Sequence, residues 1–216
     1  MSTIHITPRR QLGLAPAERE HLERRARLLA WGSNAWHIVE FAIAIGAGIA
    51  AGSIALVAFG ADSLIEGGAG LVIVWLFTGT RRGSLTAERR AQQFVAVSYF
   101  ILAAYVAADA VLALFGGRHP DVSWVGLGLA ALTAPTMPLL ARAKRKVGHA
   151  LGSSATVSEA EQNQICAYLS IALLVGLGGN AAFGWWWADP VAALVIAAVA
   201  AREGVESWKG ESCECC

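Results

Sequence analysis

The sequence has little charge, and no lysine or arginine lies in the middle of any of its apolar runs. Only 15% of its 216 residues are Asp, Glu, Lys or Arg, whereas 56% are hydrophobic. This balance is typical of an integral membrane protein rather than of a water-soluble one. The formal net charge of +1 provides no overall attraction to a polyanion, so we expect no nucleic-acid partner.

Cysteine is also scarce and unevenly placed: Cys166 stands alone, and Cys213, Cys215 and Cys216 crowd the end of the chain. This spacing does not form a disulfide framework. The N-terminal region is polar and rich in arginine, with no apolar core before residue 30, so we expect no cleaved signal peptide. There is no HExxH metalloprotease motif and no Ser/His or Cys/His pair placed for nucleophilic catalysis, so we do not expect an enzyme.

What the sequence does contain is a series of apolar runs, each near the ~20 residues that a helix needs to cross a bilayer. They cover about residues 31–52, 53–79, 91–116, 122–141, 157–183 and 190–205. We therefore predict an all-α fold, an integral bundle of six transmembrane helices over residues 31–208. A cytosolic segment (1–30) precedes this domain, and a Cys-rich cytosolic tail (209–216) follows it. Pro135 and Pro138 predict a kink in the fourth helix.

The positive charges predict the orientation of these helices. All Lys and Arg residues except Arg118 lie before the first run, between runs two and three, between runs four and five, or near the C-terminus. The positive-inside rule then places both termini in the cytosol. We predict a multi-pass protein of the cell membrane, the inner membrane if the source is bacterial, with Trp185, Trp186 and Trp187 at the outer interface.

Two acids, Asp62 and Glu66, lie four residues apart near the middle of the second run. In a helix they share a face, so two carboxylates that repel each other would point the same way inside the membrane. A bound divalent cation relieves this cost, because carboxylate oxygens are natural ligands for it. The alternatives are an acid pair that shares one proton and a pair neutralised by a basic residue from another helix.

The fifth run offers a second pair at the same spacing, Gln162 and Cys166. A thiolate is a strong ligand for zinc-like metals, whereas an amide oxygen is a weak one. The alternative is that Cys166 packs as a small hydrophobic residue while Gln162 hydrogen-bonds a neighbouring helix.

Other polar residues are secondary candidates. His37 and Glu40 share a face of the first helix; they offer a cytosolic access site or a proton relay, but we favour a protonated Glu40 with His37 near the cytosolic interface. Asp109 is a lone acid of the third run that either lines a cavity or hydrogen-bonds another helix. Asp189 precedes Pro190, a pattern that favours a structural cap on the sixth helix.

Several of these segments resemble the cation diffusion facilitators. The run SIALVAFGADSLIEG is similar to the second helix of that family, which carries two acids four residues apart. SATVSEAEQNQIC is similar to its fifth helix, and WADPVAALVIA to the start of its sixth. The resemblance implies a tetrahedral metal site of Asp62, Glu66, Gln162 and Cys166. Glu66 stands where the family usually has Asp, Gln162 where it has His or Asp, and Cys166 where it has Asp. It also implies a compact member with the membrane domain only.

We therefore expect a secondary transporter that exports a divalent transition metal in exchange for protons. Zn²⁺ is the favoured cargo, with Cd²⁺, Co²⁺ or Ni²⁺ as alternatives, and no permanent cofactor is expected. The resemblance implies a homodimer in the lipid bilayer. Cys213, Cys215 and Cys216 would capture metal near the pore, or else form an incidental or palmitoylated tail. The alternative function is a non-transporting metal-binding membrane protein that regulates a partner.

Overall fold

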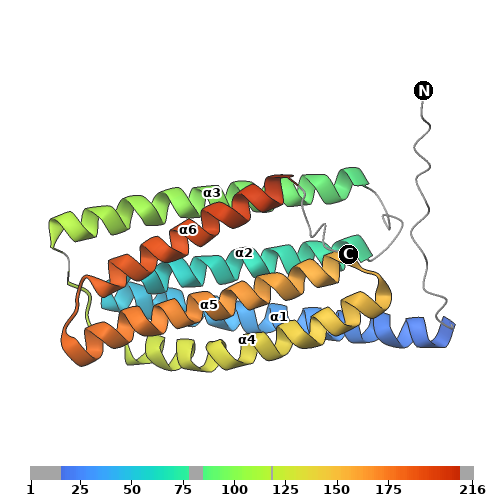
Figure 1. Cartoon of the computed structure of the whole chain (residues 1–216), viewed down its shortest axis with the longest axis horizontal. Coiled ribbons are helices and arrows are strands. Elements are labelled where there is room, and N and C mark those ends of the chain that lie inside the picture. Colours follow the sequence, from blue (N-terminus) through green and yellow to red (C-terminus); the bar gives the residue numbers. More distant parts are fainter. Residues whose placement is uncertain (1–15, 78–84, 118, 210–216) are drawn as a thin grey trace.

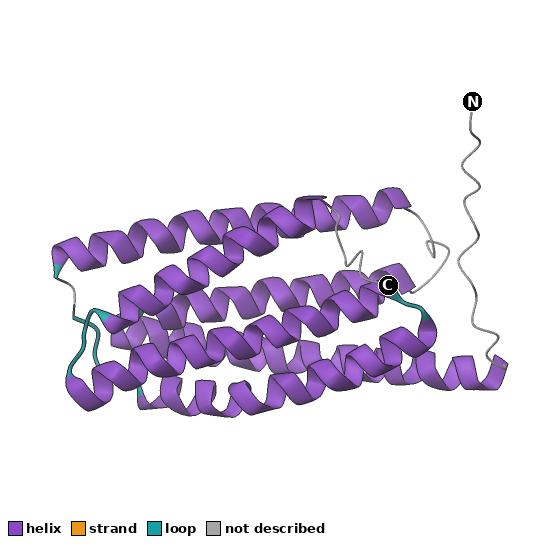
Figure 2. Cartoon of the chain, viewed as in Figure 1, coloured by secondary structure: helices purple, strands orange, loops and turns teal. Residues whose placement is uncertain are grey.

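The computed structural model describes residues 16–77, 85–117 and 119–209, and these residues form six α-helices joined by short connections (Figure 2). The predicted all-α fold is therefore confirmed, while the Cys-rich tail lies outside the described residues. The helices are α1 (Pro16–Ala51), α2 (Ile54–Phe77), α3 (Leu85–Gly116), α4 (Trp124–Leu151), α5 (Ser154–Phe183) and α6 (Ala188–Lys209).

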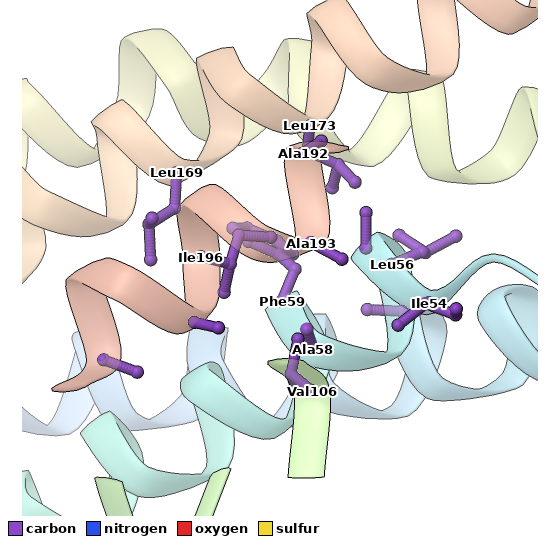
Figure 3. Packing of buried hydrophobic residues seen from close by; sticks show 14 of the residues in the cluster. Ile54, Leu56, Ala58, Phe59, Val106, Leu169, Leu173, Ala192, Ala193 and Ile196 are labelled. Atoms are coloured by element: carbon purple, nitrogen blue, oxygen red, sulfur yellow. The ribbon is translucent and has the colours of Figure 1, made fainter. Parts of the chain in front are cut away.

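Four of the helices, α1, α2, α4 and α5, form one bundle, and α3 and α6 pack as a pair along its side (Figure 1). The start of α1 and the α4–α5 connection lie at one end of the molecule, which we call the hairpin end. The α1–α2, α3–α4 and α5–α6 connections lie at the opposite end (Figure 1). A buried apolar cluster joins the pair to the bundle, with Phe59 of α2, Val106 of α3, Leu169 of α5 and Ile196 of α6 among its members (Figure 3).

The six predicted membrane spans are confirmed in part. Among the described residues, four helical segments are long and apolar enough to cross a membrane: Ala17–Ala51, Gln93–Gly116, Trp124–Leu151 and Glu159–Phe183. That α2 and α6 also cross the membrane, and that the chain divides at residues 30 and 208, stay predictions.

Two helices are longer than their apolar runs. α1 begins at Pro16, so the polar residues 16–30 and the first apolar run form one continuous helix. α4 continues through Pro135 and Pro138 to Leu151 instead of ending near residue 141. The added segments are rich in Arg, Lys, Glu and Leu, which are good helix formers, so the end of an apolar run does not end the helix. As a result Lys144, which the sequence placed in a connection, lies within α4 and is buried.

The same turn occurs at both ends of the four-helix bundle. Between α1 and α2, Ser53 N donates to Gly48 O at 3.0 Å; between α4 and α5, Ser153 N donates to Gly148 O at 2.9 Å. Both turns contain a left-handed glycine, with φ of 65° at Gly52 and 62° at Gly152. A Cβ added to Gly48 or Gly148 would come within 2.8 Å of a valine methyl on the next helix, so each turn requires glycine for this close approach. The two turns differ by 100 in residue number and face opposite ways.

Asp189 caps a helix other than its own. Its carboxylate accepts hydrogen bonds from Ser53 Oγ and from the backbone N–H groups of Ile54 (3.0 Å) and Ala55 (3.5 Å), at the start of α2. The prediction that it caps the sixth helix is wrong, because α6 begins one residue earlier, at Ala188. A negative charge at this position stabilises the positive N-terminal end of α2 and fixes it to α6.

Replacing Asp189 with Ala should destabilise the protein, because it leaves Ser53 and two buried N–H groups at the start of α2 without their acceptor. Loss of such a cap costs about 0.5–2 kcal/mol. We expect a lower midpoint in thermal unfolding of the purified protein in detergent. The matched control is Asp121→Ala, at an exposed acid of the α3–α4 connection, and an equal fall in both variants would contradict the capping role.

Candidate metal centre

The centre of the four-helix bundle contains three different metal-ligating side chains from three helices: His37 of α1, Glu66 of α2 and Cys166 of α5. One ligand atom from each lies within 4.8 Å of the others, and all three side chains are buried. His37 Nε2 is 3.4 Å from Glu66 Oε2 and 3.2 Å from Asn163 Nδ2. The Cys166 side chain is fully enclosed, with a relative exposure of 0%.

A second carboxylate, Glu40 of α1, lies against this group and is held by hydroxyl groups. Ser63 Oγ donates to Glu40 Oε2 at 2.9 Å, and Thr133 Oγ1 of α4 donates to Oε1. The same Oε2 is 3.4 Å from His37 Nδ1, and Cys166 Sγ lies 4.0 Å away. Glu40 therefore orients the imidazole from behind, as the carboxylate partner of a metal-bound histidine does.

The four ligands expected from the sequence do not converge equally. Glu66 and Cys166 meet, and Gln162 lines a narrow cavity together with Glu66 and His37. Asp62 is buried one helical turn from Glu66, but it lies outside the three-residue group, and its Oδ2 has no hydrogen-bond partner among the described residues. Gln162 is therefore a neighbour of the group in the same cavity, and Asp62 is a second carboxylate on the same face of α2 as Glu66.

The secondary candidates also divide. His37 is buried among the helices as a member of the group, and Glu40 Oε2 lies 3.4 Å from its Nδ1, while the expected position of His37 relative to the cytosolic interface stays a prediction. The structure does not bring Asp109 of α3 into the three-residue group. Cys213, Cys215 and Cys216 fall outside the described residues.

Lys144 of α4 and Glu159 of α5 were not singled out from the sequence. They form an ion pair with 3.3 Å between Nζ and Oε2, and both line the cavity that contains His37 and Glu66. The available signal was the position of Lys144, seven residues after Met137 and thus on the same face of α4. The sequence pattern assigned this lysine to a basic connection instead.

An imidazole nitrogen, a carboxylate oxygen and a thiolate sulfur are the three protein ligand types of zinc sites. Three ligands of this mixed set leave a fourth tetrahedral position for water, Gln162 or a second carboxylate. The group is thus chemically suited to a Zn²⁺-like cation. Hard cations such as Mg²⁺ and Ca²⁺, which prefer oxygen ligands alone, would be disfavoured by Cys166.

The fold and this buried polar centre define a helical membrane protein of the kind that handles cations. Residues 35–209 match the cation efflux transmembrane domain, and the chain belongs to the cation diffusion facilitator family. The resemblance noted in the sequence is therefore confirmed, and with it the class of protein, a membrane cation transporter. No curated protein matches the chain.

We predict that His37→Gln lowers the affinity for Zn²⁺ about tenfold or more, because it removes the only nitrogen of the three-ligand group. Glu66→Gln and Cys166→Ser should do the same, and Gln162→Ala should have a smaller effect. Calorimetric titration of the purified protein with Zn²⁺ measures this. His149→Gln, at an exposed histidine of α4, is the control, and wild-type affinity in His37→Gln would remove His37 from the site.

Proposed function

We propose that this protein is a secondary transporter that exports a Zn²⁺-like divalent cation from the cytosol in exchange for protons. The observation that carries the proposal is the convergence of His37, Glu66 and Cys166 from three helices at a buried point in the bundle. Membership of the cation efflux family supports cation transport. The metal is the cargo of this site, and Zn²⁺ fits its three ligand types best, ahead of Cd²⁺, Co²⁺ and Ni²⁺.

Proton exchange is supported by the chemistry of the ligands. Imidazole, carboxylate and thiolate bind metal only when deprotonated, so metal arriving from the cytosol displaces protons from them. Protons arriving from the outside then displace the metal. The same site thus binds either cargo in turn, which is the requirement for antiport.

The inverted relation of the two halves supports alternating access. The α1–α2 and α4–α5 hairpins contain the same turn at opposite ends, and the site lies between them. Transporters built from inverted repeats hold substrate near the middle of the membrane and move one repeat against the other. We also propose that the protein acts in the cell membrane and forms a homodimer. The positive-inside rule places both termini and the hairpin end in the cytosol.

An imposed pH gradient should drive metal flux in proteoliposomes. We expect Zn²⁺ uptake into the lumen when the lumen is acidic, with protons leaving it in exchange, followed by a pH-sensitive dye. Asp62→Asn and Glu66→Gln should lose this flux, Glu66→Asp should retain part of it, and His149→Gln should retain all of it. Metal flux that ignores the gradient would exclude antiport, and metal binding without any flux would favour a non-transporting regulator.

The proposed orientation can be tested with the native tail cysteines. A membrane-impermeant maleimide should label Cys213, Cys215 and Cys216 only after the cells are permeabilised, because the positive-inside rule places the tail in the cytosol. In a variant with these three residues replaced by serine, Asp121→Cys at the opposite end should be labelled in intact cells. If the tail cysteines are labelled in intact cells and Asp121→Cys is not, the orientation is the opposite of the one proposed, and the direction of transport would be uptake.

A further inference from the structure

A second polar layer lies between the three-ligand group and the hairpin end. It contains Asn34 of α1, Lys144 of α4, and Glu159 and Asn163 of α5, all at most 5% exposed. Asn34 precedes His37 by three residues, and Glu159 precedes Cys166 by seven, so both lie on the hairpin side of the ligands.

Several buried polar atoms of this layer have no hydrogen-bond partner among the described residues. These atoms are Glu159 Oε1, Asn163 Oδ1 and both polar atoms of the Asn34 amide, Oδ1 and Nδ2. Lys144 Nζ pairs with Glu159 Oε2. Buried polar atoms are normally paired. The three oxygens, one of them on an acid, therefore form a polar space that can hold a further positive group, with the Asn34 amide nitrogen turned away from it.

Two of these oxygens converge on Gly70 of α2. A Cβ built on Gly70 would collide with Asn34 Oδ1 and would come within 3.0 Å of Glu159 Oε1. Glycine here leaves room for both oxygens beside the helix, one turn beyond Glu66. The carboxylate and the amide therefore face the same small space from opposite helices.

We propose that Asn34, Glu159 and Asn163 form an inner divalent-cation site, and that the ammonium group of Lys144 occupies it while no metal is bound. Metal from the hairpin end displaces Lys144 from Glu159 and then moves on to His37, Glu66 and Cys166. Lys144 returns to Glu159 behind it and closes the path. A lysine is suited to this role because its charge is a compact point on a flexible stem.

This inference deepens the proposed function and rests on it for the direction of movement, whereas the occupancy of the inner site does not depend on transport. The first test is therefore an equilibrium measurement. The number of bound Zn²⁺ ions is determined by dialysis in purified protein whose three tail cysteines are replaced by serine, so that the tail binds no metal.

Lys144→Met should bind one more Zn²⁺ per chain than the wild type, because Glu159 is then left without its resident cation. The double variant Lys144→Met, Glu159→Gln should lose this additional ion. Lys144→Arg should bind as the wild type does, and so should Lys146→Met, an exposed lysine two residues away on α4. An unchanged number of ions in folded Lys144→Met would overturn the proposal.

The second test is kinetic and applies even if Lys144→Met does not fold. Glu159→Gln should raise the KM for metal supplied at the hairpin end about tenfold, the effect of one charge-assisted contact, and leave kcat unchanged. Glu161→Gln, two residues along α5 and outside the cavity lining, is the matched control. An unchanged KM in a transporting protein would overturn the inner site and leave the proposed function intact. If Lys144→Met binds an additional ion but the wild type transports no metal, the inner site is supported and the proposed transport function is overturned.

Discussion

The constraint on which the structure depends is the excess of buried acid over buried base. Among the described residues, six carboxylates are buried (Glu40, Asp62, Glu66, Glu159, Asp189 and Glu203), against one ammonium group, Lys144, and one imidazole, His37. A charge inside a membrane is costly unless it is paired, hydrogen-bonded or neutralised. Hydroxyl groups donate hydrogen bonds to Glu40, and the N-terminus of α2 donates to Asp189. Lys144 pairs with one of the two carboxylate oxygens of Glu159. Asp62 and Glu66 each keep a carboxylate oxygen that accepts no hydrogen bond from the described residues, and a cation bound beside them would offset this cost.

The arrangement of the two hairpins explains why ligands from distant parts of the chain meet there. Asp62 and Glu66 on α2 correspond to Gln162 and Cys166 on α5, each pair the same number of residues after its Gly–Ser turn. Because the hairpins run in opposite directions, equal spacing from the two turns brings both pairs to the middle of the bundle. The two pairs are not equivalent, however: α2 offers two carboxylates and α5 an amide and a thiol, and only Glu66 and Cys166 join His37 in the three-residue group. The site is therefore chemically asymmetric within a nearly symmetric frame.

The sequence could predict the helices and part of the candidate site, because both depend on the spacing of residues along apolar runs. Asp62 and Glu66 were visible as acids in an apolar run, and Gln162 and Cys166 through their matching spacing. It could not rank His37, because the contact of His37 with Glu66 depends on how α1 is rotated against α2, which no local pattern records. Lys144 was missed for a different reason: hydropathy locates the end of an apolar run, whereas α4 continues past it and buries the lysine.

The proposed transport site must release its cargo, and three candidate ligands would hold a cation less tightly than four strong ones. Structural zinc sites have four strong ligands, whereas sites that exchange a ligand hold the metal with three and keep one position open. Here His37, Glu66 and Cys166 supply three, and the neighbouring Gln162 offers only a neutral amide. Lys144 lines the same cavity as Glu66, so its positive charge would repel a metal ion bound at Glu66 and weaken the binding of that ion. An Asp or His at position 162 would complete a stronger set, and we expect it to trade turnover for affinity.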